Sequence, residues 1–194
     1  MTIQMNTILI ANRGEIAVRI IRTAQHLGYA TVAVFSDVDA DAPHVQQADQ
    51  AVYLGPADAS ESYLNAERIL KAVHQSGADT LHPGYGFLSE NADFAQQVID
   101  AGILWIGPTP DSMRIMGNKA AAKAALAGSN VPLIPGYFGR DQSDTAFVTA
   151  MEQIGYPVMI KATAGGGGRG MRLVTRADDL LSALASARSE SFKA

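Results

Sequence analysis

The chain has 194 residues, 47% of them hydrophobic and 18% charged, which allows a packed core and excludes wholesale disorder. Its net charge of −4 argues against nucleic acid or an anionic membrane surface as its main partner. It has no cysteine, so disulfides, thiolate nucleophiles and cysteine-ligated zinc are excluded.

Strands and helices alternate along the first half of the chain. Apolar runs rich in β-branched residues predict buried strands, and apolar residues at helical spacing predict the helices between them. The strands are expected at residues 6–11, 30–35, 51–54, 79–82 and 103–107, and the helices within 14–28, 63–77 and 91–102. This order predicts an α/β fold with a Rossmann-like parallel sheet covered on both faces.

The composition changes after residue 117. Residues 118–128 are alanine-rich and predict a linker helix. Beyond a turn-rich stretch, we expect a helix near 144–154, two strands within 157–174 and a final helix from Ala177. The chain therefore divides into a Rossmann-like domain at 1–117, a linker at 118–133 and an incomplete unit at 134–194, because two strands and two helices do not make a domain.

A run of four glycines at 165–168, followed by Arg169 and Gly170, separates the last two predicted strands. It matches G-x-G-x-x-G, but a dinucleotide fingerprint is followed by a helix, and here a strand follows. The first βα turn has only Gly14, which makes the first domain a poor NAD binder. Glycines let a backbone approach phosphate oxygens closely, so we predict a phosphate-covering hairpin loop with Lys161 beside it. The alternative is a flexible linker, although two apolar strands flank the loop.

Residues 82–91, HPGYGFLSEN, follow the fourth predicted strand. The proline and two glycines predict a tight, irregular loop that exposes Tyr85 and Phe87. Ligands of open α/β sheets bind beyond the carboxyl ends of the strands. A binding loop is therefore one interpretation, and a rigid turn that holds two aromatic rings in the core is the other.

Other polar residues give no site by themselves. His82, like the other histidines, has no partner at metal-ligand spacing, so it is predicted to be structural or on the surface. Residues 37–41, DVDAD, lack the rest of an EF-hand loop, and we expect a solvated turn. Lys119 and Lys123 lie on an alanine-rich helix and by composition alone are surface lysines.

Four segments together closely resemble the N-terminal part of biotin carboxylase, the biotin-carboxylating subunit or domain of biotin-dependent acyl-CoA carboxylases. They are residues 8–45, 82–95, 107–123 and 155–174, and with the intervening sequence the resemblance covers essentially the whole chain. It implies a pre-ATP-grasp domain over 1–117 and a truncated ATP-grasp lid subdomain over 134–194. Residues 82–91 narrow the resemblance to biotin carboxylases and their close kin.

The resemblance implies a ligase in which MgATP (or MnATP) phosphorylates bicarbonate to carboxyphosphate, whose CO2 is captured by N1 of biotin. Fixed cations and amides must meet the charge that develops on the phosphoryl group. Lys119 and Lys161 resemble two family lysines that contact the ATP phosphates, and Tyr85 and Gly86 resemble residues on the biotin side. The ATP lid of the family corresponds to Gly165, Gly166, Gly167, Gly168, Arg169, Gly170 and Met171.

The sequence departs from the family pattern in two ways. Ala164 stands where many members have a glycine, which we expect to stiffen the loop entry without abolishing binding. The adenine hinge, the metal-binding glutamates, the bicarbonate-binding arginine and the catalytic base of the family match no segment here. We therefore assign no catalytic or metal-binding residue within the chain, and expect a fragment that does not turn over alone.

The resemblance also implies partners: a biotin carboxyl carrier domain, a carboxyltransferase subunit and a second copy in a homodimer. The helix with Arg19 and Arg22 is a candidate dimer surface, or simply a solvated face. No apolar run approaches the roughly 20 residues of a membrane helix and no signal peptide is seen, so we expect a cytoplasmic protein.

Two other functions stay open at this point. One is another ATP-grasp ligase, such as a carbamoyl-phosphate synthetase-like enzyme, which residues 82–91 disfavour. The other is a non-catalytic nucleotide-binding or assembly module. Acetyl-, propionyl-, methylcrotonyl- and geranyl-CoA carboxylases and pyruvate carboxylase share the motifs, so several final acceptors are compatible with them.

Overall fold

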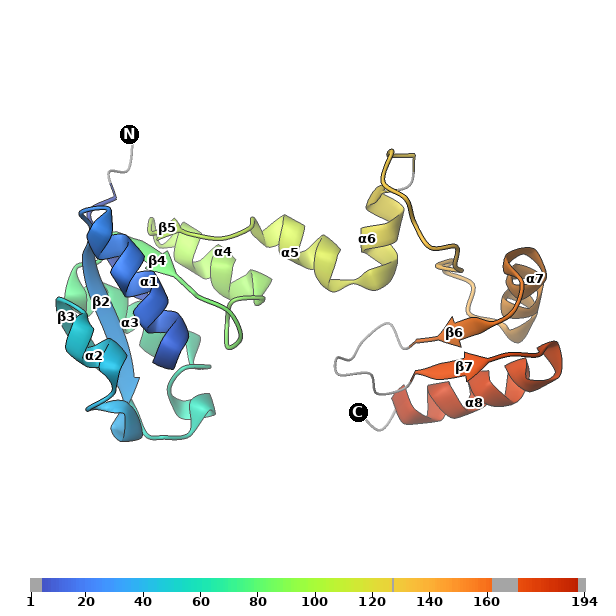
Figure 1. Cartoon of the computed structure of the whole chain (residues 1–194), viewed down its shortest axis with the longest axis horizontal. Helices are drawn as coiled ribbons and strands as arrows, with labels where there is room; N and C mark the ends of the chain where they lie inside the picture. The colour runs from blue at the N-terminus through green and yellow to red at the C-terminus, as the bar shows by residue number, and fades with distance from the viewer. Residues whose placement is uncertain (1–4, 127, 162–170, 192–194) are drawn as a thin grey trace. The chain divides into compact units, whose positions relative to one another are not determined.

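The computed structural model describes residues 5–126, 128–161 and 171–191 (Figure 1). The chain forms two compact units, Met1–Arg114 and Ile115–Ala194. Within the described residues, no helix is long and apolar enough to cross a membrane.

A five-stranded parallel sheet forms the centre of the first unit. Its strands are β1 (Thr7–Ile10), β2 (Ala30–Ser36), β3 (Gln50–Gly55), β4 (Thr80–His82) and β5 (Leu104–Trp105). They lie in the order β3-β2-β1-β4-β5, and Leu9 of β1 pairs with Val32 on one side and Leu81 on the other. The order reverses between β1 and β4, which creates a switch point at their carboxyl ends.

Helices cover both faces of this sheet (Figure 1). On one face lie α1 (Gly14–His26) and α2 (Pro43–Gln47), and on the other lie α3 (Ala66–Ser76) and α4 (Ala92–Asp100). Side chains alternate along β1, so Ile8 and Ile10 pack in the core under α1 while Leu9 packs in the core under α3 and α4. The predicted α/β class, with a sheet buried on both faces, is confirmed.

The ends of two helices follow signals that can be read from the sequence. Asn65 and Asn91 are the N-caps of α3 and α4, and their side-chain oxygens accept the backbone N–H of Arg68 and Phe94. Gly77 ends α3 in the left-handed conformation, with φ of 70°. Because all five strands pair in parallel, their carboxyl ends lie at one edge of the sheet.

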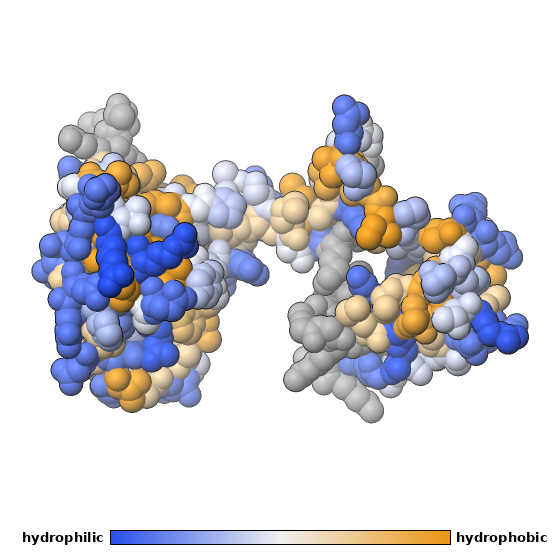
Figure 2. All heavy atoms as spheres, viewed as in Figure 1, coloured by the Kyte–Doolittle hydropathy of each residue, from blue (hydrophilic) through white to orange (hydrophobic). Residues whose placement is uncertain are grey.

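The second unit contains α6 (Lys119–Leu126), α7 (Asp144–Ile154), β6 (Val158–Ile160), β7 (Arg172–Val174) and α8 (Leu180–Ser191), and the boundary between the units falls within α5 (Pro110–Gly117). The two strands are antiparallel, with Met159 opposite Leu173. Val174 packs with α7 and α8 in a small core of its own. Apolar side chains also reach the surface of this unit, where orange atoms are visible in Figure 2.

Candidate functional site

The loop after β4 is held by the turn that follows β1. Asn12, only 2% exposed, donates both amide hydrogens to carbonyl oxygens of the loop, those of Pro83 and Tyr85, each at 2.8 Å. Its oxygen accepts the backbone N–H of Arg13 at 2.9 Å. Gly84 lies between the two bound carbonyls at φ of +69°, and a Cβ there would come within 2.6 Å of the Asn12 amide nitrogen. The close approach of the two loops therefore requires glycine.

The two aromatic residues of this loop have different environments. Tyr85 is 61% exposed, and its hydroxyl donates to the carboxylate of Glu15 in the first turn of α1. This hydrogen bond raises the pKa of Tyr85. Phe87 instead packs against the core, with its ring stacked on that of Tyr63 at a centroid distance of 5.1 Å. The loop thus combines the two sequence interpretations: one ring is presented to solvent and the other anchors the turn.

A buried carboxylate supports the same edge of the sheet. Asp39 is 5% exposed and accepts hydrogen bonds from Arg13 Nε at 2.7 Å, the Tyr63 hydroxyl at 2.7 Å and the Ser36 hydroxyl at 3.1 Å. Burial raises the pKa of Asp39, but these hydrogen bonds outweigh it and hold the pKa below its usual value. The expectation of a solvated turn at 37–41 is wrong for Asp39, because an arginine from another loop reaches it.

The phenol of Tyr63 links this carboxylate to the loop. Burial and the hydrogen bond to Asp39 raise the pKa of Tyr63 to about 12, so the phenol is protonated at neutral pH. Its ring meanwhile carries the stacked Phe87. Arg13, Asp39, Tyr63 and Phe87 therefore form one continuous support from the β1 turn to the β4 loop.

His82 is a structural member of the loop. Its Nδ1 accepts the backbone N–H of Gly84 at 3.0 Å, which requires that nitrogen to be unprotonated. Burial lowers the pKa of His82, in agreement with a neutral ring. The residue stabilises the first turn of the loop.

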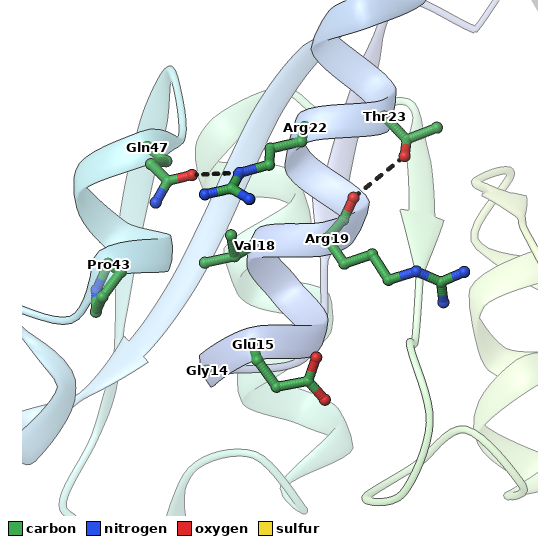
Figure 3. A pocket seen from close by; sticks show the side chains of 8 residues that line it. All are labelled: Gly14, Glu15, Val18, Arg19, Arg22, Thr23, Pro43 and Gln47. Carbon is green, nitrogen blue, oxygen red and sulfur yellow. Dashed lines mark hydrogen bonds between the residues drawn. The ribbon is translucent and has the colours of Figure 1, made fainter.

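An open groove of about 610 Å³ lies next to Glu15, between α1 and the start of α2 (Figure 3). Arg22 crosses it to donate to Gln47 Oε1 at 3.2 Å, while the side chain of Arg19 extends from the same helix (Figure 3). The lining residues are Gly14, Glu15, Val18, Arg19, Arg22, Thr23, Pro43 and Gln47. Two arginines thus belong to the lining of a groove that begins at Glu15, the partner of Tyr85.

The hairpin of the second unit has one apolar face turned to solvent. Met159 and Leu173, which lie opposite each other, are 44% and 62% exposed. Strand alternation places Lys161 and Met171, both exposed, at the positions that continue this face. The face therefore ends in a cation, a combination suited to an aromatic base with phosphates attached.

Several residues that we expect to bind ATP lie outside the part of the chain that the structure describes, either wholly or with their side chains. Residues 165–170, the glycine loop with Arg169, lie outside the described residues. Lys119 is the first residue of α6, and its side chain also lies outside the described part. Among the residues that the structure describes, no group of three His, Cys, Asp or Glu side chains is placed to hold a metal ion.

Sequence reasoning missed Asn12 and Glu15. The single glycine of the turn at 11–16 argues only against a nucleotide-binding turn and indicates no other role for its residues. An available signal was a polar residue directly after a buried central strand, because such a residue faces the carboxyl edge of the sheet where the neighbouring loop passes.

Comparison with known families gives two matches that together span the chain. The family described as "Biotin carboxylase, N-terminal domain" matches residues 4–113. The family described as "Carbamoyl-phosphate synthase L chain, ATP binding domain" matches residues 118–194.

Curated relatives resemble the chain over nearly its whole length. Methylcrotonoyl-CoA carboxylase subunit alpha from Oryza sativa subsp. japonica is 52% identical over 94% of this chain and 25% of its own. Biotin carboxylase 2 from Populus trichocarpa is 51% identical over 100% of this chain and 37% of its own. Biotin carboxylase from Allochromatium vinosum is 48% identical over 100% and 43%. The chain thus spans between 25% and 43% of the length of these relatives.

Solved structures share the fold. The biotin carboxylase–beta-gamma-ATP complex from Campylobacter jejuni has a TM-score of 0.89 and 43% identity, over 98% of this chain and 43% of that one. The biotin carboxylase domain dimer of Hydrogenobacter thermophilus 2-oxoglutarate carboxylase, in complex with MgADP, ADP and bicarbonate, has a TM-score of 0.85 and 42% identity, over 98% and 42%.

Proposed function

The chain belongs to the family of biotin carboxylase N-terminal domains, and we propose on this basis that it works as the N-terminal part of a biotin carboxylase. Such an enzyme is a ligase that uses MgATP and bicarbonate to carboxylate biotin, carried on a partner domain, through carboxyphosphate. Residues 1–117 then serve as the pre-ATP-grasp domain, 118–133 as the linker and 134–194 as part of the ATP-grasp lid.

The loop at 82–91 is the observation that carries the proposal. It leaves β4 at the carboxyl edge of the sheet, where open α/β sheets bind their ligands. Buried hydrogen bonds from Asn12 fix its backbone, yet Tyr85 remains exposed. An aromatic ring held in this way can contact a planar, polar group. We assign Tyr85 and Gly86 to the biotin side.

ATP fits the hairpin of the second unit. A purine can pack on the apolar Met159–Leu173 face, and phosphates can reach the exposed Lys161 that ends it. We assign to ATP binding Lys119, Lys161, Gly165, Gly166, Gly167, Gly168, Arg169, Gly170 and Met171. Cations and amides at these positions would stabilise charge on the transferred phosphoryl group.

A magnesium or manganese ion would enter with the nucleotide. Mg²⁺ is commonly bound by substrate phosphates together with only one or two carboxylates. We assign none of the described residues to the ion, because the metal-binding glutamates of the family match no segment of this chain. The ion would neutralise phosphate charge during transfer.

The proposed partners follow from the same assignment. They are a biotin carboxyl carrier domain, a carboxyltransferase subunit and a second copy of the enzyme, and the Hydrogenobacter relative is described as a dimer. We also propose a cytoplasmic location, although the Populus relative is described as chloroplastic. Cell fractionation with an antibody to this chain tests the location.

ADP release tests the function. The full-length enzyme that carries this sequence is assayed with Mg²⁺, bicarbonate and free biotin, beside the 194-residue chain. We expect biotin-dependent release from the former and none from the latter.

Lys161→Ala should lower kcat/KM for ATP by about 100-fold, because it removes a fixed cation from the phosphates. Lys71→Ala, which removes an exposed lysine from α3, is the matched control and should leave kcat/KM unchanged.

Release that needs bicarbonate but no biotin would point to a different ATP-grasp ligase. The match of residues 118–194 to a carbamoyl-phosphate synthase ATP-binding domain makes such a ligase the second candidate. That result would remove the roles given to Tyr85 and Gly86. Bicarbonate-dependent turnover by the 194-residue chain alone would overturn the expected inactivity.

A further inference from the structure

The turn after β1 contacts Tyr85 at both of its ends. At the backbone end, Asn12 donates to the carbonyl oxygens of Pro83 and Tyr85, at 2.8 Å each. At the side-chain end, Glu15 accepts the hydrogen bond of the Tyr85 hydroxyl. Two residues that are three positions apart in sequence thus hold this tyrosine, Asn12 by its backbone carbonyl group and Glu15 by its hydroxyl group.

These contacts leave the tyrosine uncovered. Asn12 is buried and donates both of its amide hydrogens to the loop after β4, whereas Tyr85 is 61% exposed. A tyrosine that served the core would be packed, as Tyr63 is. A buried donor that holds an exposed ring is instead the arrangement expected where a ligand-contacting side chain must be held in advance of binding.

The same turn has a different use in related folds. In dinucleotide-binding Rossmann units, a glycine-rich turn after the first strand binds a pyrophosphate. Here the turn has a single glycine, Gly14, and the side chains of Asn12 and Glu15 are directed to the loop after β4. The position at the switch point is retained, but the turn binds protein in place of nucleotide.

We propose that Asn12 and Glu15 are positioning residues for Tyr85, so that the turn after β1 sets the affinity of the enzyme for biotin. This inference rests on the proposed function, because it takes Tyr85 as a contact of biotin. Neither residue touches the substrate. Each acts through the tyrosine, Asn12 on its backbone and Glu15 on its hydroxyl.

A purely structural role would give different effects. The Glu15–Tyr85 pair is exposed, and exposed pairs contribute little to folding stability. Removing Glu15 should therefore leave the melting temperature unchanged while it frees the ring. Asn12 is buried, and its loss leaves two carbonyl oxygens unpaired, so Asn12 variants can also lose stability. The Glu15 variants consequently provide the cleaner test.

The kinetic experiment uses the full-length enzyme, with free biotin varied at saturating MgATP and bicarbonate. Glu15→Ala should raise KM for biotin about fivefold with KM for ATP unchanged, while Glu15→Gln, whose amide oxygen still accepts, should restore most of the affinity. In a Tyr85→Phe background, Glu15→Ala should have no further effect. The matched control is Glu67→Ala, which removes an exposed carboxylate from the first turn of α3 and should change nothing.

Asn12 is tested with Asn12→Asp, which keeps the shape of the side chain but cannot donate to the two carbonyl groups. KM for biotin should rise about tenfold or more, again with KM for ATP unchanged. Equal increases in both KM values, or no increase in the soluble variants of either residue, would overturn the proposal.

Phenol titration provides a readout that does not depend on turnover. The difference in ultraviolet absorbance between the wild type and Tyr85→Phe isolates the ionisation of Tyr85. Glu15→Ala should lower the pKa of Tyr85, and Glu67→Ala should not, because the hydrogen bond to Glu15 is what raises it.

If the wild type shows no biotin-dependent ADP release, the proposed function and this role both fail, and the titration still reports whether Glu15 holds the ring. If biotin dependence is present but Glu15→Ala leaves KM for biotin and the titration unchanged, the positioning role alone is overturned.

Discussion

Single buried residues determine how this fold responds to acid. His44 on α2 is fully buried and donates from Nε2 to the carbonyl oxygen of Val34 at 3.2 Å, while its buried Nδ1 has no hydrogen-bond partner among the described residues. Burial lowers the pKa of His44, and burial also lowers that of His82. Between the folded and unfolded pKa values, the unfolded chain therefore binds more protons than the folded chain.

We therefore expect stability to be complete above the unfolded histidine pKa of about 6.5 and to fall as the pH drops below it. Urea unfolding at several pH values between about 8 and 5 measures this slope. His44→Gln should flatten the slope, whereas His26→Gln, at an exposed position in the last turn of α1, should not. An unchanged slope in His44→Gln would mean that the residue is already protonated or accessible in the folded state.

The roles of single residues were the hardest feature to predict from the sequence. Asp39 was expected in a solvated turn, yet Arg13 from the β1 turn reaches it through a bidentate ion pair. Composition could not reveal this, because the partner lies 26 positions away in sequence. Lys161 stood out only through its place beside a glycine loop, and Lys119 only through the family resemblance. Long-range polar contacts have no local periodicity from which they can be inferred.

Elements were more predictable, since capping and periodicity are local. The helices α1, α3 and α4 lie within the expected ranges, and Asn91 caps α4 at the start of its range. The sequence pattern predicts no helix at α5, which begins at Pro110. A proline is tolerated at the first helical position, and Thr109 accepts the backbone N–H of Ser112 at 3.2 Å as an N-cap does.

The loop after β4 depends on a glycine for a reason that can be tested. Gly84→Ala should destabilise the protein for two reasons: a left-handed residue with a Cβ costs about 1–2 kcal/mol, and the clash with Asn12 adds to it. Gly102→Ala separates the conformational cost from the cost of the clash. Gly102 has φ of +75°, but no atom that the structure describes lies within 4 Å of the added Cβ. Denaturant unfolding should give the larger loss for Gly84→Ala. The difference between the two losses of stability should shrink in an Asn12→Ala background, which removes the clash. An equal loss of stability at both glycines would show that Gly84 does not closely approach Asn12.

At the scale of the whole molecule, each of the two units has a hydrophobic core built from its own residues, within the part of the chain that the structure describes. The core clusters of the first unit contain residues up to Met113, and that of the second contains Tyr137 to Leu184. The alternation of strands and helices was enough to predict the first unit, because a parallel sheet buries both faces. The sequence of the second unit predicts only two short strands with their helices, and its assignment as an ATP-grasp lid rests on the family resemblance.

Separate cores predict two unfolding transitions. Leu9 is fully buried in the first unit, and Leu184 is buried in the second. Each Leu→Ala change should cost about 3 kcal/mol through lost burial and the cavity left behind. Leu9→Ala should therefore lower only one transition in a calorimetric scan, and Leu184→Ala only the other. If both variants shifted a single shared transition, the two units would unfold as one cooperative block, and the prediction of two transitions would be wrong.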